Sequence, residues 1–278
     1  MSEEASKAGP LYVYGLAATG ALAPDAALGE GVEAAAVRLF AEGRLSALVS
    51  PLAPDPAAGG QVAQTRRNMI AHTAVLERAM AGVAKPGVAK PGVAKLGVTV
   101  LPVRFGTVAP DAAALARCIA GNATALGEAL AEIDGRVELG VKARWREGVV
   151  YEEILAGNAA LRELRDRLRG RPAGETYYER VELGRRVEAA LAERRAAETA
   201  AILADLARLA ERELPLRAVE EDMILNHAFL VRRDQEARFD AQVQSLADRC
   251  GGRISLRYVG PVPPYNFVRL RADWLAAA

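Results

Sequence analysis

Residues 223–259 read MILNHAFLVRRDQEARFDAQVQSLADRCGGRISLRYV, and this stretch decides the fold because it predicts a strand, a helix and a second strand in succession. Residues 224–231 form an apolar run of strand length. Four apolar residues then recur at spacings of four, three and four, on one face of a helix: Phe239, Val243, Leu246 and Cys250. Residues 253–259 alternate between apolar and polar, which is typical of a half-buried strand.

The ends of this helix also have sequence signals. Asp234 stands where an N-cap is expected, and Glu236 adds negative charge to the first turn. Gly251 and Gly252 are expected to end the helix.

The rest of the second half predicts a further strand, two helices and a short strand, which precede this stretch. The expected elements are a strand at 137–145, helices at 151–168 and 174–214, and a short strand at 216–219. If continuous, the long helix would be roughly 60 Å long at a rise of 1.5 Å per residue, longer than a single small domain. The second half therefore has the order βαββαβ.

The first half predicts a similar order. The expected elements are a central strand at 11–16, a brief helix within 24–33, a hairpin of strands at 37–40 and 45–49, a helix at 62–80, a strand at 98–105 and a helix at 111–133. We therefore predict an α+β fold of two tandem ferredoxin-like domains, at 10–133 and 134–260, with long helices and a C-terminal tail at 261–278.

Residues 82–96 contain three copies of a five-residue unit, GVAKP GVAKP GVAKL. Proline removes a backbone donor and disfavours helix at the preceding residue, so a mobile loop is expected. The favoured interpretation is a tolerated loop expansion. The alternative is a basic arm that contacts a partner through Lys85, Lys90 and Lys95.

Composition narrows the classes of partner. The 36 Lys and Arg residues balance 35 Asp and Glu residues, and a net charge of +1 provides no field that would attract nucleic acid or an anionic membrane. No signal peptide or long uninterrupted apolar segment stands out, so a soluble, cytoplasmic protein without membrane contact is expected.

Residue chemistry gives little indication of catalysis. The two cysteines form no CxxC pair and the chain has 2 histidines, so we expect no metal site and no cofactor. His227 is interpreted as a buried, hydrogen-bonded histidine, the acidic run 220–222 as a solvated hairpin loop, and the pair Tyr177 and Tyr178 as a packing anchor. No nucleophile, base and oxyanion donors assemble, so we expect no enzyme.

The tail has the other unusual signal. Pro261, Pro263 and Pro264 stiffen it, and the apolar residues that follow need a surface to cover. The favoured interpretation is that the tail folds back over its own domain, and the alternative is that it contacts another protein. The candidate partner-binding residues are Pro264, Tyr265, Phe267, Leu270 and Trp274.

Six motifs in order then resemble one family. They are LYVYGL at 11–16, LPVRFGT at 101–107, VELGVKARW at 137–145, YYERVELGRR at 177–186, NHAFLV at 226–231 and GPVPPYNFV at 260–268. Together they resemble the F/L family of gas vesicle proteins, GvpF and GvpL. The GVAKP repeat has no counterpart in that pattern.

The resemblance implies an accessory or minor structural protein of gas vesicles, the gas-filled protein shells that give microbes buoyancy. It implies contact with the small, very hydrophobic shell protein GvpA during nucleation or assembly, with other gas vesicle proteins as further partners. The tail and the long helix are the candidate surfaces. One alternative is a small-molecule-binding regulatory module using Asn226, His227 and Arg232. Another is an enzyme with a Glu or Tyr acid or base.

Overall fold

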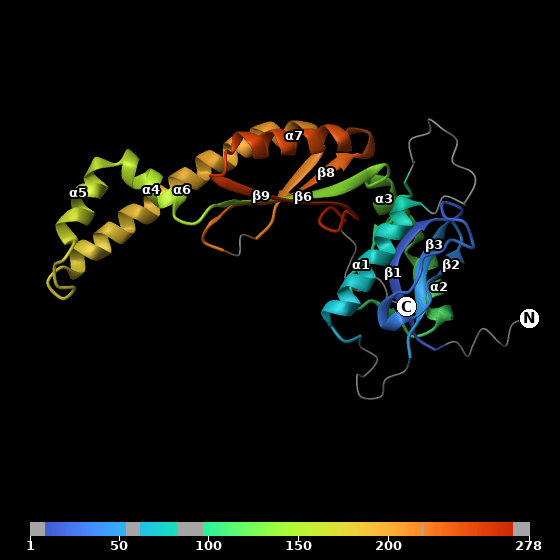
Figure 1. Cartoon of the computed structure of the whole chain (residues 1–278). Coiled ribbons are helices and arrows are strands. Elements are labelled where there is room, and N and C mark those ends of the chain that lie inside the picture. Colours follow the sequence, from blue (N-terminus) through green and yellow to red (C-terminus); the bar gives the residue numbers. More distant parts are fainter. Residues whose placement is uncertain (1–8, 54–61, 83–96, 218–219, 269–278) are drawn as a thin grey trace, which may run out of the picture. The chain divides into compact units, whose positions relative to one another are not determined.

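The computed structural model describes residues 9–53, 62–82, 97–217 and 220–268. The chain divides into two compact units, one of residues up to Glu138 together with those from Pro261 onward, and one of Leu139–Gly260. Each unit contains one sheet and its own helices (Figure 1). The α+β fold with two antiparallel sheets and long helices is as predicted. All but one residue of the GVAKP repeat lies outside the described residues.

The sheet of the first unit is built around its N-terminal strand. Its strands are β1 (Leu11–Ala18), β2 (Arg38–Glu42), β3 (Leu45–Pro51), β4 (Leu101–Pro102) and β5 (Val108–Ala109). The order is β2-β3-β1-β4, with β5 paired to β1, and the paired strands are antiparallel. The predicted β2–β3 hairpin is confirmed, and Gly43 in its turn has a φ of 57°.

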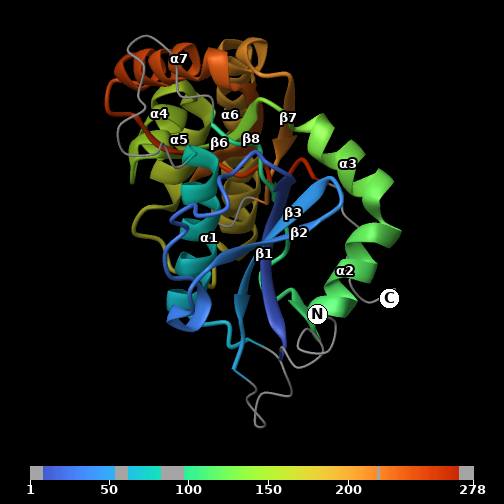
Figure 2. The same ribbon diagram turned by 90° about the vertical axis from the view of Figure 1, so that its right-hand side faces the viewer.

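Helices cover both faces of this sheet (Figure 2). On one face lies α1 (Arg66–Ala81), and on the other lie α2 (Ala112–Gly121) and α3 (Ala123–Glu132). Thr65 caps α1 by accepting from the backbone of Asn68, and Asp111 caps α2 by accepting from that of Ala114. As predicted, β1 is therefore a central strand that is buried on both faces.

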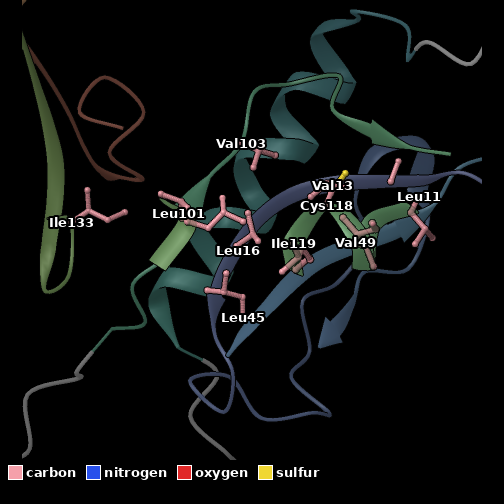
Figure 3. Packing of buried hydrophobic residues seen from close by; sticks show 14 residues of the cluster. Leu11, Val13, Leu16, Leu45, Val49, Leu101, Val103, Cys118, Ile119 and Ile133 are labelled. Carbon is pink, nitrogen blue, oxygen red and sulfur yellow. The ribbon is translucent and has the colours of Figure 1, made fainter. Parts of the chain in front are cut away.

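The face of β1 that contacts α2 and α3 contributes to the apolar core (Figure 3). This core joins Leu11, Val13 and Leu16 of β1 to Cys118 and Ile119 of α2. A register shift between Val13 and Gly15 marks a β-bulge in the strand. The opposite face of β1 presents Tyr12 and Tyr14, both fully buried.

The second unit has a four-stranded sheet. Its strands are β6 (Arg136–Trp145), β7 (Arg212–Pro215), β8 (Met223–Arg232) and β9 (Ile254–Val262), in the order β7-β8-β6-β9. Its helices are α4 (Val149–Gly157), α5 (Ala159–Leu168), α6 (Tyr177–Leu206) and α7 (Glu236–Arg249). Figure 1 shows α7 and the C-terminal part of α6 on one face of the sheet, with α5 and the N-terminal part of α6 extending beyond it.

The opening stretch folds as predicted apart from its cap. Phe239, Val243, Leu246 and Cys250 are buried, and Phe239 of α7 packs against Phe229 of β8 with ring centroids 5.2 Å apart. Asp234 is not the helix cap, because Arg232 donates two hydrogen bonds to its carboxylate, at 3.0 and 2.6 Å. A short 3₁₀ turn at 233–235 leads into α7 instead.

Charged side chains tie the helices of the second unit to β9. Arg253, just before β9, donates to Glu153 of α4 and to Glu198 of α6. Arg194 of α6 also contacts both carboxylates. The Arg253 hydrogen bond is the largest effect that lowers the pKa of Glu153. The network thus joins α4, α6 and the start of β9.

Two of the predicted helices are interrupted by asparagine. The helix expected at 111–133 is broken at Asn122, whose side chain donates to the carbonyl of Cys118 at 2.8 Å. The helix expected at 151–168 is broken at Asn158, whose side chain accepts from the backbone of Leu161 at 3.1 Å. In both cases a short amide satisfies a helix-end backbone group, so two helices replace one.

Three further element predictions were wrong. The long helix ends at Leu206 rather than 214, because residues 212–215 pair with β8 as β7, which replaces the strand expected at 216–219. Of the strand expected at 98–105, only 101–102 forms a strand paired with β1, and a single backbone hydrogen bond from Val103 to Tyr14, at 3.1 Å, follows it. Within 24–33 no α-helix forms: the chain has a turn at 24–25, and a 3₁₀ helix follows at Val32–Ala34.

Candidate partner-binding surfaces

The first part of the tail packs within the first unit. Pro263 and Pro264 are buried, and Phe267 is only 2% exposed. Two short backbone hydrogen bonds shape the turn: Tyr265 donates to Pro263 at 2.7 Å, and Phe267 donates to Pro264 at 3.1 Å. The tail therefore folds back, but it packs in the first unit and not over the second-half domain that it follows, which corrects the favoured interpretation.

His72 of α1 joins this tail to the central strand. Its Nε2 lies 2.9 Å from the hydroxyl of Tyr265, and its Nδ1 lies 2.9 Å from the hydroxyl of Tyr12. The Tyr12 oxygen also accepts from the backbone of Gly106 at 3.1 Å. Burial lowers the pKa of His72 to about 4, so the ring is neutral at physiological pH and one of its nitrogens must accept a hydrogen bond.

A second buried group, Glu138 of β6, also holds the tail. Its carboxylate accepts from the backbone N–H of Asn266 at 2.9 Å and from the side-chain amide of the same residue. Glu138 is 5% exposed, and burial raises the pKa of its carboxyl group while the Asn266 donors act in the opposite direction. A buried acid thus recognises one residue of the tail through two donors.

This docking bears on the predicted partner-binding residues. Pro264 and Phe267 are buried, and Tyr265 is partly buried with its hydroxyl engaged. Leu270 and Trp274 lie outside the described residues. Partner binding by the tail stays a prediction, and Pro264 and Phe267 could reach a partner only if the docked segment were released.

The long helix exposes an apolar patch at its N-terminus, which we call the tip patch: Tyr177, Tyr178 and Val181. Their exposed fractions are 62%, 85% and 54%. The two tyrosine rings lie edge to face with centroids 5.4 Å apart. The expectation that Tyr177 and Tyr178 are packing anchors is therefore wrong. Both side chains face solvent.

The tip patch lies next to the turn between α5 and α6, and side-chain hydrogen bonds stabilise this turn. The guanidinium of Arg180 donates to the carbonyls of Leu168 and Arg171, at 3.3 and 3.1 Å, and to the hydroxyl of Thr176 at 2.9 Å. Leu168 ends α5, so Arg180 satisfies a carbonyl that the helix itself leaves open. Arg180 therefore fixes the first turn of α6, on which the patch lies.

The remaining candidate residues do not form one site. Asn226 and His227 are neighbours on β8 and therefore point to opposite faces of the sheet, and Arg232 lies at the end of the strand. His227 is buried as predicted, but among the described residues its Nδ1 atom has no hydrogen-bond partner, so the predicted hydrogen bond is not found at that nitrogen. Glu220 and Asp222 pair with Arg144. Within the described ranges, no group of three or more His, Cys, Asp and Glu side chains could hold a metal ion.

Nearly the whole chain matches one protein family. Residues 10–86 and 92–269 match the model of the family described as gas vesicle synthesis protein GvpL/GvpF. The chain belongs to the GvpL/GvpF family. The gap in this match, 87–91, falls within the GVAKP repeat, which also had no counterpart in the motif comparison.

Related sequences and structures agree with this assignment. The gas vesicle protein F of Streptomyces sp. (strain CB03234) is 34% identical over 260 residues, which cover 92% of this chain and 98% of that protein. The crystal structure of GvpF from Anabaena sp. PCC7120 superposes with a TM-score of 0.76 at 25% identity, covering 95% of this chain and 99% of that one. GvpF from Microcystis aeruginosa gives a TM-score of 0.72 at 25% identity, covering 94% and 99%.

Membership of the GvpL/GvpF family makes this a gas-vesicle-related protein, as the six motifs suggested. In the part of the chain that the structure describes, no helix has the length and apolar character needed to cross a membrane.

Proposed function

We propose that this GvpL/GvpF protein is an accessory or minor structural component of gas vesicles that binds the hydrophobic shell protein GvpA during nucleation or assembly. The observation that supports this most is the family match, which spans nearly the whole chain and both units. The proposal includes residence at the gas vesicle, contact with other gas vesicle proteins, and a role without catalysis. It also includes the ferredoxin-like interpretation of both sheets, which their strand orders support.

We assign the contact with GvpA to the tip patch. Tyrosine is enriched among the residues that dominate binding energy, and here two tyrosines and a valine lie together on one helical turn. The charges beside the patch are paired within the chain, Glu182 with Arg185 and Arg186, and Glu179 with Arg171. A patch with neutralised charges at its border suits a strongly apolar partner.

The distal tail is the second candidate surface, because Leu270 and Trp274 follow the docked segment. The structure shows where to cut the chain to test it. A truncation after Val268 removes Leu270 and Trp274 and keeps the residues that bind His72 and Glu138. A cut after Val259 would also remove the docked segment and the end of β9, so it could not separate binding from folding.

The test is a pull-down of purified GvpA with four versions of the chain. These are the full chain, the truncation after Val268, a tip variant with Tyr177→Gln, Tyr178→Gln and Val181→Gln, and a control with Tyr151→Gln. Tyr151 is 46% exposed on α4, so it matches the tip tyrosines in chemistry but lies outside the patch. Circular dichroism must show that all four have the same helix content.

We expect the full chain, the truncation and the Tyr151 control to retain GvpA, and the tip variant to lose about tenfold or more in affinity. Loss by the truncation alone would move the contact to the distal tail. Equal binding by all four would place it elsewhere on the two units. Failure of the full chain to bind would overturn direct recognition of GvpA.

A further inference from the structure

A pocket in the second unit lies where β8 ends and α7 begins. Its volume is about 590 Å³. It is lined by Arg208, Leu209, Ala210, Glu211, Arg232, Gln235, Arg238 and Gln242. Three guanidinium groups and two amides therefore surround one opening. We call this the arginine pocket.

Contacts within the chain hold two of the three arginines in place. Arg232 is fixed by its two hydrogen bonds to Asp234, at 3.0 and 2.6 Å. The Nη1 atom of Arg238 donates to the Oε1 atom of Gln235 at 2.9 Å. The side chain of Gln235 also hydrogen-bonds the Asp234 carboxylate, so one residue contacts both Arg238 and the partner of Arg232. Side chains that are already oriented lose less freedom when they bind.

The charges at the pocket do not cancel. Glu211 lines it and Asp234 lies beside it, so two carboxylates face three guanidinium groups, an excess of one positive charge. Six of the eight lining residues carry polar side chains that are longer than serine, and five of these six have hydrogen-bond donor groups. This donor excess favours a ligand that brings acceptors and negative charge.

We propose that the arginine pocket binds a small molecule through a carboxylate or phosphate group. The planar guanidinium group matches both oxyanions with two parallel hydrogen bonds. The volume of about 590 Å³ lies within the range of small-molecule sites and exceeds the space that one oxyanion group needs. Leu209 and Ala210 provide apolar contact for the remainder of such a ligand.

This site differs from the regulatory cluster expected from the sequence. Arg232 belongs to it, whereas Asn226 and His227 do not line it. Arg208 and Arg238 come from the end of the α6 region and from α7. Ligand binding here does not depend on contact with GvpA, so either proposal could fail while the other stands.

The test is isothermal titration calorimetry of the full chain with pyrophosphate and, separately, with citrate, in about 0.1 M salt to screen weak surface attraction. The pocket variant is Arg208→Gln with Arg238→Gln, which leaves the Arg232–Asp234 pair intact. The matched control is Arg117→Gln with Arg257→Gln. Both of its arginines are exposed and lie outside the pocket, and the change in net charge is the same.

We expect saturable binding of at least one probe, weakened about tenfold or more in the pocket variant and unchanged in the control. Binding of pyrophosphate alone would identify a phosphate ligand, and binding of citrate alone a carboxylate ligand. Absence of saturable binding by either probe would overturn the proposal. Equal weakening in the pocket variant and the control would also overturn it, because the binding would then reflect net charge.

Discussion

The hydroxyl of Tyr265 lies 2.9 Å from Nε2 of His72, although 193 positions separate the two residues in the sequence. The bond completes a buried series from Tyr12 through His72 to Tyr265. It therefore fixes the docked tail segment to both α1 and β1 of the first unit.

Replacing Tyr265 by Phe should lower the free energy of unfolding by about 1 kcal/mol or more, because Nε2 of His72 loses its partner while the ring remains. Urea denaturation measures the effect. Tyr178→Phe is the control, since Tyr178 is 85% exposed, and it should change stability by less than about 0.5 kcal/mol. Equal effects of the two changes would mean that the buried hydrogen bond adds nothing.

Acidification should weaken the fold through His72. Above its ordinary pKa of 6.5 the ring is neutral in both states, and between 6.5 and about 4 only the unfolded chain takes up the proton. The free energy of unfolding should therefore fall by up to about 3 kcal/mol across this window. Denaturation at several pH values measures the fall, and NMR of the ring should show no titration until the pH nears 4.

Glu138 acts in the opposite direction and must be separated from this effect. Because the pKa of its carboxyl group is raised, the folded state takes up that proton first as the pH falls, which favours folding. The His72→Gln variant keeps the Glu138 contribution and removes that of His72. The difference between the two proteins isolates His72, and identical pH profiles would contradict the assignment.

Asn266 offers a graded test of the Glu138 contact. Asn266→Ala removes the side-chain donor and should cost about 1–3 kcal/mol, while the backbone bond to Glu138 remains. Asn266→Asp should cost more at pH 7, because it places a second carboxylate against a buried one. The penalty of the Asp variant should shrink as the pH falls. An Asp variant as stable as the Ala variant at pH 7 would show that Glu138 is protonated there.

Two glycines should respond in opposite directions to alanine. A Cβ at Gly184 of α6 would meet no atom within 4 Å, so Gly184→Ala should stabilise the protein by about 0.5–1 kcal/mol. A Cβ at Gly15 of β1 would lie 2.7 Å from the carbonyl oxygen of Leu101, so Gly15→Ala should destabilise it by about 1–3 kcal/mol. Thermal unfolding of both variants decides whether β1 packs this closely on β4.

Removal of Arg180 should loosen the turn under the tip patch. Arg180→Ala leaves the carbonyls of Leu168 and Arg171 without this donor, so amide hydrogen exchange should become faster in the last turn of α5 and the first turn of α6. Exchange in α7 should not change, which provides an internal control. Affinity for GvpA should also fall if the tip patch is the contact. Unchanged exchange at the turn would show that Arg180 does not stabilise it.

Elements with a clear pattern could be predicted from the sequence. The periodicity of Phe239, Val243 and Leu246 identified α7, and the alternation at 137–145 identified β6. Their boundaries were harder to place, because they depend on side chains that compete for the backbone. Asn122 and Asn158 each divide a predicted helix, and their short amides are a signal that the apolar periodicity did not include.

The buried polar contacts were missed for a different reason. In the sequence, Tyr12 and Tyr14 are two aromatic residues of an apolar strand, and Glu138 is one polar position of an alternating strand. Only the fold shows that Tyr12 meets His72 and that Glu138 meets Asn266, which are far apart in the sequence. The available signal was His72, one of the 2 histidines of the chain, within a predicted helix. Pairing over such separations requires the tertiary structure.

The arginine pocket illustrates the same limit. Arg208, Arg232 and Arg238 fall in three different elements, and each alone reads as a solvated charge. Arg232 was grouped with Asn226 and His227 in the predicted cluster because the three residues are close in sequence. The alternation of β8 separates them, whereas the end of the strand brings Arg232 beside α7.

The docking of Tyr265 and Asn266 also sets an order of events during synthesis. The first unit takes its last contacts from residues that follow the entire second unit, Leu139–Gly260. At roughly 5–20 residues per second, a ribosome needs on the order of 10 s to translate that unit. During this time His72 and Glu138 are present without Tyr265 and Asn266. A chain released before residue 265 would leave His72 and Glu138 without their hydrogen-bond partners. Such a truncated chain would therefore differ in stability from the full-length protein, even though its first 138 residues are intact.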